Sequence, residues 1–91
     1  MQTSQNSTSE IAILSRVLEP EEPTFSPEAA RSILAMDFGH QDRERMQELA
    51  AKARAGMLSS EEQCEIESYE KAGHVLSLMK AKAKVSLRKN S

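Results

Sequence analysis

The pattern of apolar and polar residues along the chain predicts three helices preceded by a shorter amphipathic arm. Apolar residues recur three or four positions apart, the spacing that places side chains on one face of a helix. In the arm this face consists of Ile11, Leu14 and Leu18. The run Glu19-Pro20-Glu21-Glu22-Pro23 ends the arm, because proline disfavours helical geometry in the residue before it. A tail, the arm and this acidic, proline-rich linker therefore occupy residues 1–23. The arm either packs loosely on the domain or folds on a partner.

The strongest local signals lie at a hinge between two runs rich in helix-forming residues. Gly56 stands where a helix end places a residue in the left-handed conformation, which glycine adopts without a Cβ clash. Ser59 and Glu62 then form the S-x-x-E pattern of a capping box, which begins a new helix. Because the stop and start signals stand this close, the flanking helices, at about 41–55 and 60–87, should fold back as an αα-hairpin.

The remaining helix begins at Ser26-Pro27, a serine cap followed by proline at the first helical position, and is predicted over about 27–37. The sequence thus predicts an all-α fold in which a short helix and an αα-hairpin with a long C-terminal helix form one helical domain over residues 24–91. The tail before it is rich in Ser, Thr, Gln and Asn and should be disordered. Residues 80–85 alternate with period two, as a strand would, but alanine and lysine favour a helix.

Composition predicts a thin core. The 91 residues include three aromatic side chains and one cysteine, so a disulfide within the chain is excluded. A core of this size yields only ~3–5 kcal/mol of net stability, and association with another polypeptide is the remaining route to higher stability.

No apolar run approaches the ~20 residues of a membrane span. The first ten residues lack the pattern of a signal peptide, so we expect a cytoplasmic protein without membrane contact.

The titratable residues predict neither catalysis nor a metal site. His40, His74 and Cys64 are too few and too scattered for a set of metal ligands. Glu70 and His74 are spaced to face each other on a helix, but no nucleophile and no glycine-rich phosphate loop accompanies them. We therefore expect a protein that is not an enzyme, holds no cofactor and has no small-molecule substrate.

Charge is distributed unevenly, which favours an interaction module. All fourteen acidic residues lie at or before Glu70, so most of the chain suits a basic protein partner. We expect the contact with that partner to be made by the arm, through Ile11, Leu14 and Leu18, by its linker Glu19–Pro23, or by the acidic face of Glu44, Glu48, Glu62 and Glu65. Two alternatives stay open. The basic C-terminal end could contact DNA phosphates through Lys80, Lys84 and Arg88, and the long helix, apolar on more than one side, could form a homodimer.

Two segments carry a resemblance to a family. The stretch from Pro27 to Phe38 and the stretch from Asp42 to Gly56 resemble segments of short bacterial proteins of unestablished function, notably in planctomycetes and cyanobacteria. The resemblance continues through Gly73-His74-Val75-Leu76 and covers roughly residues 13–87. Members of this family tend to be encoded beside small HNH-type endonucleases, a layout similar to a toxin–antitoxin pair. The resemblance implies an antitoxin-like protein that neutralises a nuclease, and it carries over no catalytic residue.

Overall fold

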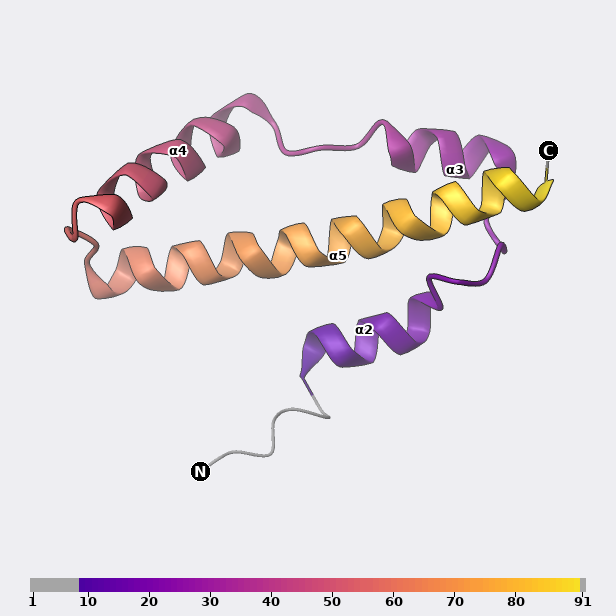
Figure 1. Ribbon diagram of the computed structural model, residues 1–91, viewed down its shortest axis with the longest axis horizontal. Helices are drawn as coiled ribbons and strands as arrows, with labels where there is room; N and C mark the ends of the chain where they lie inside the picture. The colour runs from indigo at the N-terminus through magenta and orange to yellow at the C-terminus, as the bar shows by residue number, and fades with distance from the viewer. Residues whose placement is uncertain (1–8, 91) are drawn as a thin grey trace. The chain divides into compact units, whose positions relative to one another are not determined.

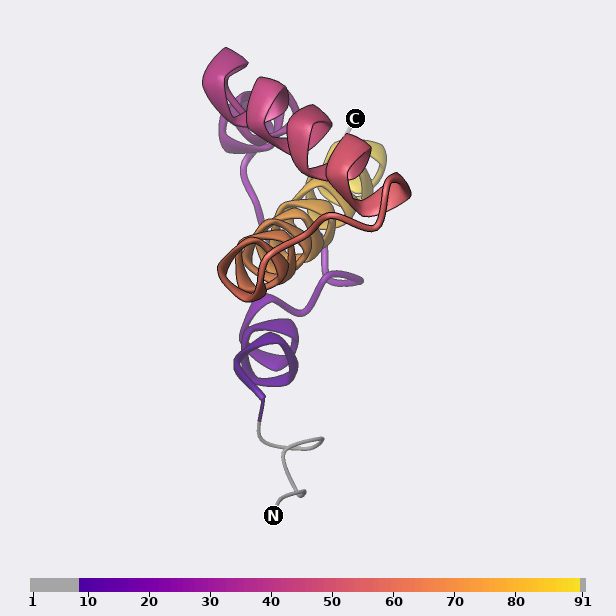
Figure 2. The ribbon, with the colours of Figure 1, turned by 90° about the vertical axis from the view of Figure 1, so that its left-hand side faces the viewer.

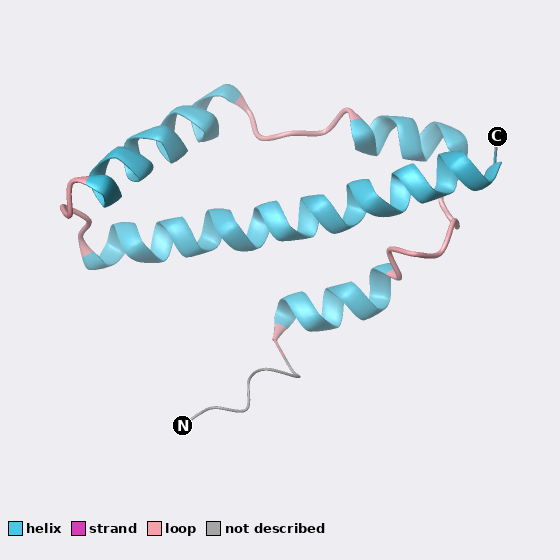
Figure 3. Cartoon of the chain, in the orientation of Figure 1, coloured by secondary structure: helices cyan, strands magenta, loops and turns pink. Residues whose placement is uncertain are grey.

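A computed structural model describes residues 9–90; residues 1–8 and 91, and the side chain of residue 90, lie outside the description, and with them most of the predicted disordered tail. The described residues form four helices and no strand. The helices are α2 (Glu10–Leu18), α3 (Pro27–Leu34), α4 (His40–Arg54) and α5 (Ser60–Asn90) (Figures 1 and 3). Short helices followed by one long C-terminal helix confirm the predicted all-α fold.

The chain divides into two compact units, and α5 contributes to both. The terminal unit comprises the residues up to Met36 together with those from His74 onward. In it, α2 and α3 lie on different sides of the C-terminal half of α5 (Figures 1 and 2). The hairpin unit is Asp37–Gly73, which holds α4, the hinge and the beginning of α5.

The end of α4 has the geometry that Gly56 predicts. Gly56 adopts φ 70°, in the left-handed region. Its N–H donates to the carbonyl of Ala53 at 3.1 Å, and the N–H of Met57 donates to the carbonyl of Lys52 at 2.9 Å. These two bonds form a Schellman motif, which satisfies carbonyl groups that the last turn of a helix leaves without a partner.

The capping box at the start of α5 is also present. The N–H of Glu62 donates to Ser59 Oγ at 3.1 Å, and the N–H of Ser59 donates to Glu62 Oε1 at 3.0 Å. With the Schellman motif before it, this pair of bonds reverses the chain within a few residues. The predicted αα-hairpin is therefore confirmed.

Two helix boundaries differ from the prediction. The helix α3 ends at Leu34, not near Asp37, because its last turn tightens: the N–H of Met36 donates to the carbonyl of Ile33, three residues back, at 3.0 Å. The helix α5 runs to Asn90, beyond the predicted end at residue 87, with basic residues in its last turn that suit the negative end of the helix dipole. It includes residues 80–85, so their period-two alternation does not mark a strand.

The core is thin, as composition predicts. Among the described residues, the buried hydrophobic side chains are Leu49 in the hairpin unit and Ala30 and Ala83 in the terminal unit. Two polar residues of α5, Lys82 and Ser86, are buried as well, with 5% and 0% of their surface exposed. Burying a polar group costs free energy unless the group is hydrogen-bonded. We therefore expect both side chains to have hydrogen-bond partners within the terminal unit.

Candidate functional site

The arm is a short helix whose apolar side chains are only partly covered. Ser9 caps it by accepting the N–H of Ala12 on its Oγ at 3.1 Å. It ends at Glu19, which adopts φ 48° and donates its N–H to the carbonyl of Ser15 at 3.1 Å. None of the residues of α2 is buried. The arm therefore contributes little to the core, although it is regular helix.

The predicted contact residues of the arm differ in how far they are exposed. Ile11 and Leu18 are half-buried, whereas Leu14 is 39% exposed. Sequence reasoning missed two further exposed residues, Ile13 at 44% and Val17 at 72%. Their spacing of four residues was the available signal, since it places both on one face. We call Ile13, Leu14 and Val17 the arm stripe.

Two buried residues of α5 hold the arm and the linker. Lys82 Nζ donates to the backbone carbonyl of Leu18 at 2.6 Å and lies 5.0 Å from the centre of the Phe25 ring, within the range of a cation–π contact. Ser86 Oγ accepts the N–H of Phe25 at 3.2 Å. The linker is thus fixed on α5 near both of its ends.

A groove of about 590 Å³ lies in the same unit between the linker and α5. Its lining residues are Ser15 of α2, Glu19, Pro20, Glu21 and Glu22 of the linker, and Leu78, Ala81 and Val85 of α5. We call it the linker groove. Its α5 side is apolar, and its linker side carries three exposed glutamates. The sequence predicts an acidic linker and a long helix that is apolar on more than one side, but it does not indicate that the two lie side by side.

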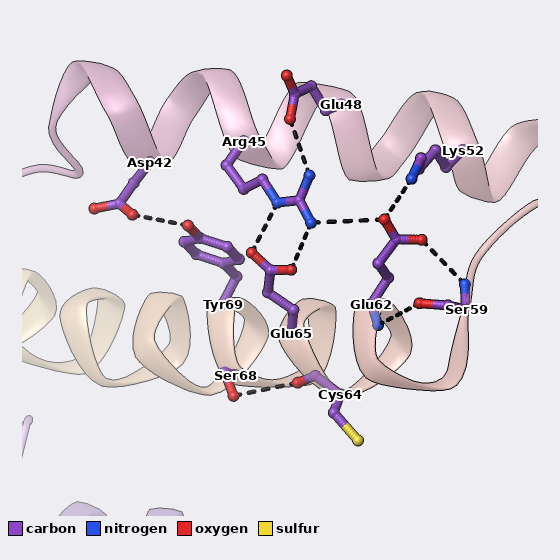
Figure 4. Close-up of polar contacts among 10 residues, drawn as sticks. All are labelled: Asp42, Arg45, Glu48, Lys52, Ser59, Glu62, Cys64, Glu65, Ser68 and Tyr69. Atoms are coloured by element: carbon purple, nitrogen blue, oxygen red, sulfur yellow. Dashed lines mark hydrogen bonds and ion pairs between the residues drawn. The ribbon is translucent and has the colours of Figure 1, made fainter.

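The hairpin unit contains a network of ion pairs centred on Arg45 (Figure 4). The guanidinium of Arg45 donates two hydrogen bonds to the carboxylate of Glu65, both at 2.8 Å, and a third to Glu48 at 3.0 Å. Lys52 donates to Glu62, whose carboxylate also lies 3.6 Å from Arg45. These pairs join α4 to the first turns of α5, so charge as well as capping holds the hairpin closed.

The network shifts the pKa values of its members in the directions expected for ion pairs. Hydrogen bonds from Lys52 and from the backbone of Ser59 lower the pKa of the Glu62 carboxyl to about 2. The Arg45 guanidinium likewise lowers the pKa of Glu65, and its own pKa is raised in return. Both glutamates therefore stay ionised through the physiological range.

A second polar contact of the hairpin joins Tyr69 to α4. The Tyr69 hydroxyl donates to a carboxylate oxygen of Asp42 at 2.7 Å, which raises the pKa of the phenol (Figure 4). The Tyr69 ring also meets the Phe38 ring edge to face, with centroids 6.0 Å apart. A small apolar cavity of about 240 Å³ adjoins Tyr69, lined also by Met46, Leu49, Ala50, Ile66 and Glu70.

Three of the four acidic residues predicted to meet a partner pair with Arg45 or Lys52 within the hairpin unit. Glu62 and Glu65 belong to the network described above and are half-buried. Glu48 is exposed and pairs with Arg45, and Glu44 is exposed and lies 3.1 Å from the imidazole of His40. The structure gives these residues a role inside the hairpin, and their contact with a partner stays a prediction.

The basic residues predicted for DNA differ in exposure. Lys84 and Arg88 are exposed and four residues apart on one face of α5, whereas Lys80 is half-buried. Lys82, which lies between Lys80 and Lys84 in sequence, is buried against Leu18 and Phe25. The basic surface near the C-terminus is therefore narrower than the number of lysines indicates.

The described residues offer few groups suited to chemistry. Across residues 9–90, no three His, Cys, Asp or Glu side chains are placed to hold a metal ion. Cys64 is exposed on α5, and its carbonyl accepts the Ser68 hydroxyl at 3.2 Å. No helix in the described part of the chain is long and apolar enough to cross a membrane.

Comparison of the chain with protein-family models, with curated proteins and with solved structures found no match. The resemblance to short bacterial proteins described above therefore stays a prediction.

Proposed function

We propose that this protein is a non-catalytic binding module that acts as the antitoxin-like, neutralising partner of a nuclease. The observation that carries the proposal is the arm stripe: Ile13, Leu14 and Val17 are 44%, 39% and 72% exposed on a helix that buries none of its residues. A short helix with so much exposed apolar surface gains stability when a second protein covers it.

The energy available from the arm stripe suits a protein interface. Full burial of one Val, Leu or Ile side chain is worth about 1.5–3 kcal/mol, and these three side chains have roughly half of that still to gain. The Lys82 and Ser86 contacts hold the arm and linker in place, so part of the ordering cost is met before a partner arrives. Such a preordered helix fits helix-in-groove recognition by a folded partner.

Charge and the family resemblance support a nuclease as that partner. Enzymes that act on nucleic acid present basic surfaces to phosphate groups. This chain has a formal net charge of −2, and three of its fourteen acidic residues lie in the linker directly after the arm. The family that the sequence resembles is encoded beside small HNH-type endonucleases, so the neighbouring gene product is the first partner to test.

The test is co-expression of the chain with the product of the neighbouring gene. We expect the wild-type chain to co-purify with that product. The Ile13→Gln/Val17→Gln variant should lose about tenfold in affinity, because glutamine keeps the helix but removes apolar surface. Met57→Gln is the matched control, since Met57 is 71% exposed but lies at the hinge. A nuclease that does not co-purify, or that is lost equally from the control, contradicts the proposal.

DNA binding is a second candidate, favoured by the exposed pair Lys84 and Arg88 on one face of α5. If it holds, the isolated chain binds duplex DNA with an affinity that falls steeply with salt, and Lys84→Gln reduces the salt slope by about 1. An isolated chain without measurable affinity for duplex DNA at low salt contradicts it.

A further inference from the structure

Three glutamates of the linker are the acidic residues best placed to meet a partner. Glu19, Glu21 and Glu22 are exposed and, within residues 9–90, none of them forms an ion pair. They differ in this from Glu48, Glu62 and Glu65 of the hairpin unit, which pair with Arg45 or Lys52. Their negative charge is therefore available to a second molecule.

These glutamates form one side of the linker groove, and the other side is apolar. Leu78, Ala81 and Val85 of α5 line the groove opposite the linker. At about 590 Å³ the groove can take large side chains. A complementary molecule must therefore carry apolar groups beside positive charges.

We propose that the linker groove binds a basic amphipathic segment of the protein partner. Apolar side chains of that segment lie against Leu78 and Val85, and its lysine or arginine side chains face the linker glutamates. This inference rests on the proposed function, because it names the part of this chain that such a partner contacts. Of the two acidic surfaces that the sequence predicts for the partner, the linker and the hairpin, it selects the linker.

The spacing of the three glutamates over residues 19–22 favours a polypeptide as the occupant, because one segment can present several positive charges to them. The linker is held on α5 through Leu18 and Phe25, so the glutamates are presented on a fixed segment. Fixing a binding segment before association lowers the entropy cost of binding.

The test uses the full-length chain and a short helical peptide built from leucine and lysine, with the leucines on one face. Binding is measured by calorimetry and located by NMR. We expect shifts of the linker amides and of α5 around Leu78 to Val85. The charge reversal Glu19→Lys/Glu21→Lys/Glu22→Lys should weaken peptide binding about tenfold. Ala81→Trp, which fills the groove at an exposed position, should weaken it without a change of charge.

The matched control is Glu61→Lys/Glu67→Lys/Glu70→Lys, which gives the same net charge from exposed residues of the hairpin unit. It should change affinity by less than about twofold. Equal weakening by the control, or shifts confined to the hairpin, overturns the inference. Co-purification with the neighbouring gene product distinguishes a failure of the groove inference from a failure of the proposed function. If it co-purifies with wild type and with the linker reversal alike, only the groove inference falls. If wild type does not bind it, the proposed function falls.

Discussion

The ammonium group of Lys82 donates a hydrogen bond to the backbone carbonyl of Leu18, 64 residues earlier in the chain, at 2.6 Å. This carbonyl belongs to the last turn of α2, where the helix leaves its C=O groups without partners. A buried lysine thus caps the arm and, through the Phe25 ring, also holds the end of the linker. We expect this contact to help hold the arm on α5.

Removing the Lys82 ammonium should therefore free the arm. Lys82→Met keeps the apolar stem but removes the hydrogen bond and the cation–π contact, at a cost of about 1–2 kcal/mol. We expect a protease specific for glutamate to cleave the linker about tenfold faster, since cleavage follows the open population. Lys84→Met, at an exposed position two residues away, should leave the rate unchanged. Equal rates for the two variants would show that Lys82 does not hold the arm.

The hinge should be sensitive to the identity of residue 56. Gly56 adopts φ 70°, so Gly56→Ala brings a Cβ into the left-handed region and should cost about 1 kcal/mol in the free energy of unfolding. Gly56→Asn should cost less, because asparagine tolerates that region. Gly39 caps α4 with φ −72° and no side-chain hydrogen bond, so Gly39→Ser should stabilise the chain by a few tenths of a kcal/mol. Thermal unfolding followed by circular dichroism measures all three, and an unchanged midpoint for Gly56→Ala would be inconsistent with the hinge geometry.

The ion pairs of Glu62 should make the hairpin sensitive to acid. The pKa of Glu62 is depressed in the folded chain, from its ordinary value of 4.5 to about 2. A depressed pKa stabilises the fold above the unfolded value, and that stabilisation is lost as the pH falls from about 4.5 toward 2. We expect the unfolding midpoint of wild type to fall across this window.

The matched variants for the acid response are Glu62→Gln and Glu61→Gln. Glutamine at residue 62 can still complete the capping box, but it removes the negative charge that pairs with Lys52 and Arg45. Its midpoint should be lower than wild type at pH 7 and should change less on acidification. Glu61 is exposed, and its variant should follow wild type. Parallel pH curves for wild type and Glu62→Gln would assign the acid response elsewhere, for example to Glu65.

Local signals in the sequence were enough to predict the hinge and the fold class. Gly56, Ser59 and Glu62 act through backbone bonds to residues a few positions away, so their spacing carries the whole geometry. The long helix α5 could also be predicted from local sequence, because its residues favour a helix over a strand. The ends of α3 and α5 differ from the prediction, where the tightened turn at Met36 and the last basic turn mark the boundary.

The candidate site was harder to predict because it depends on contacts between distant segments. Nothing near Lys82 in sequence indicates that Leu18 and Phe25 bury it. The arm has apolar residues on two sides, and only tertiary packing decides that Leu18 turns inward and Val17 outward.

The most direct measurement of the proposed role is inhibition of the nuclease that we propose as the partner. DNA cleavage by the purified nuclease is followed while the wild-type chain is added in increasing amounts. We predict that cleavage stops near one equivalent, that Met57→Gln inhibits as wild type does, and that Ile13→Gln/Val17→Gln needs about tenfold more protein. Cleavage that continues at full rate in excess wild-type chain would contradict the account.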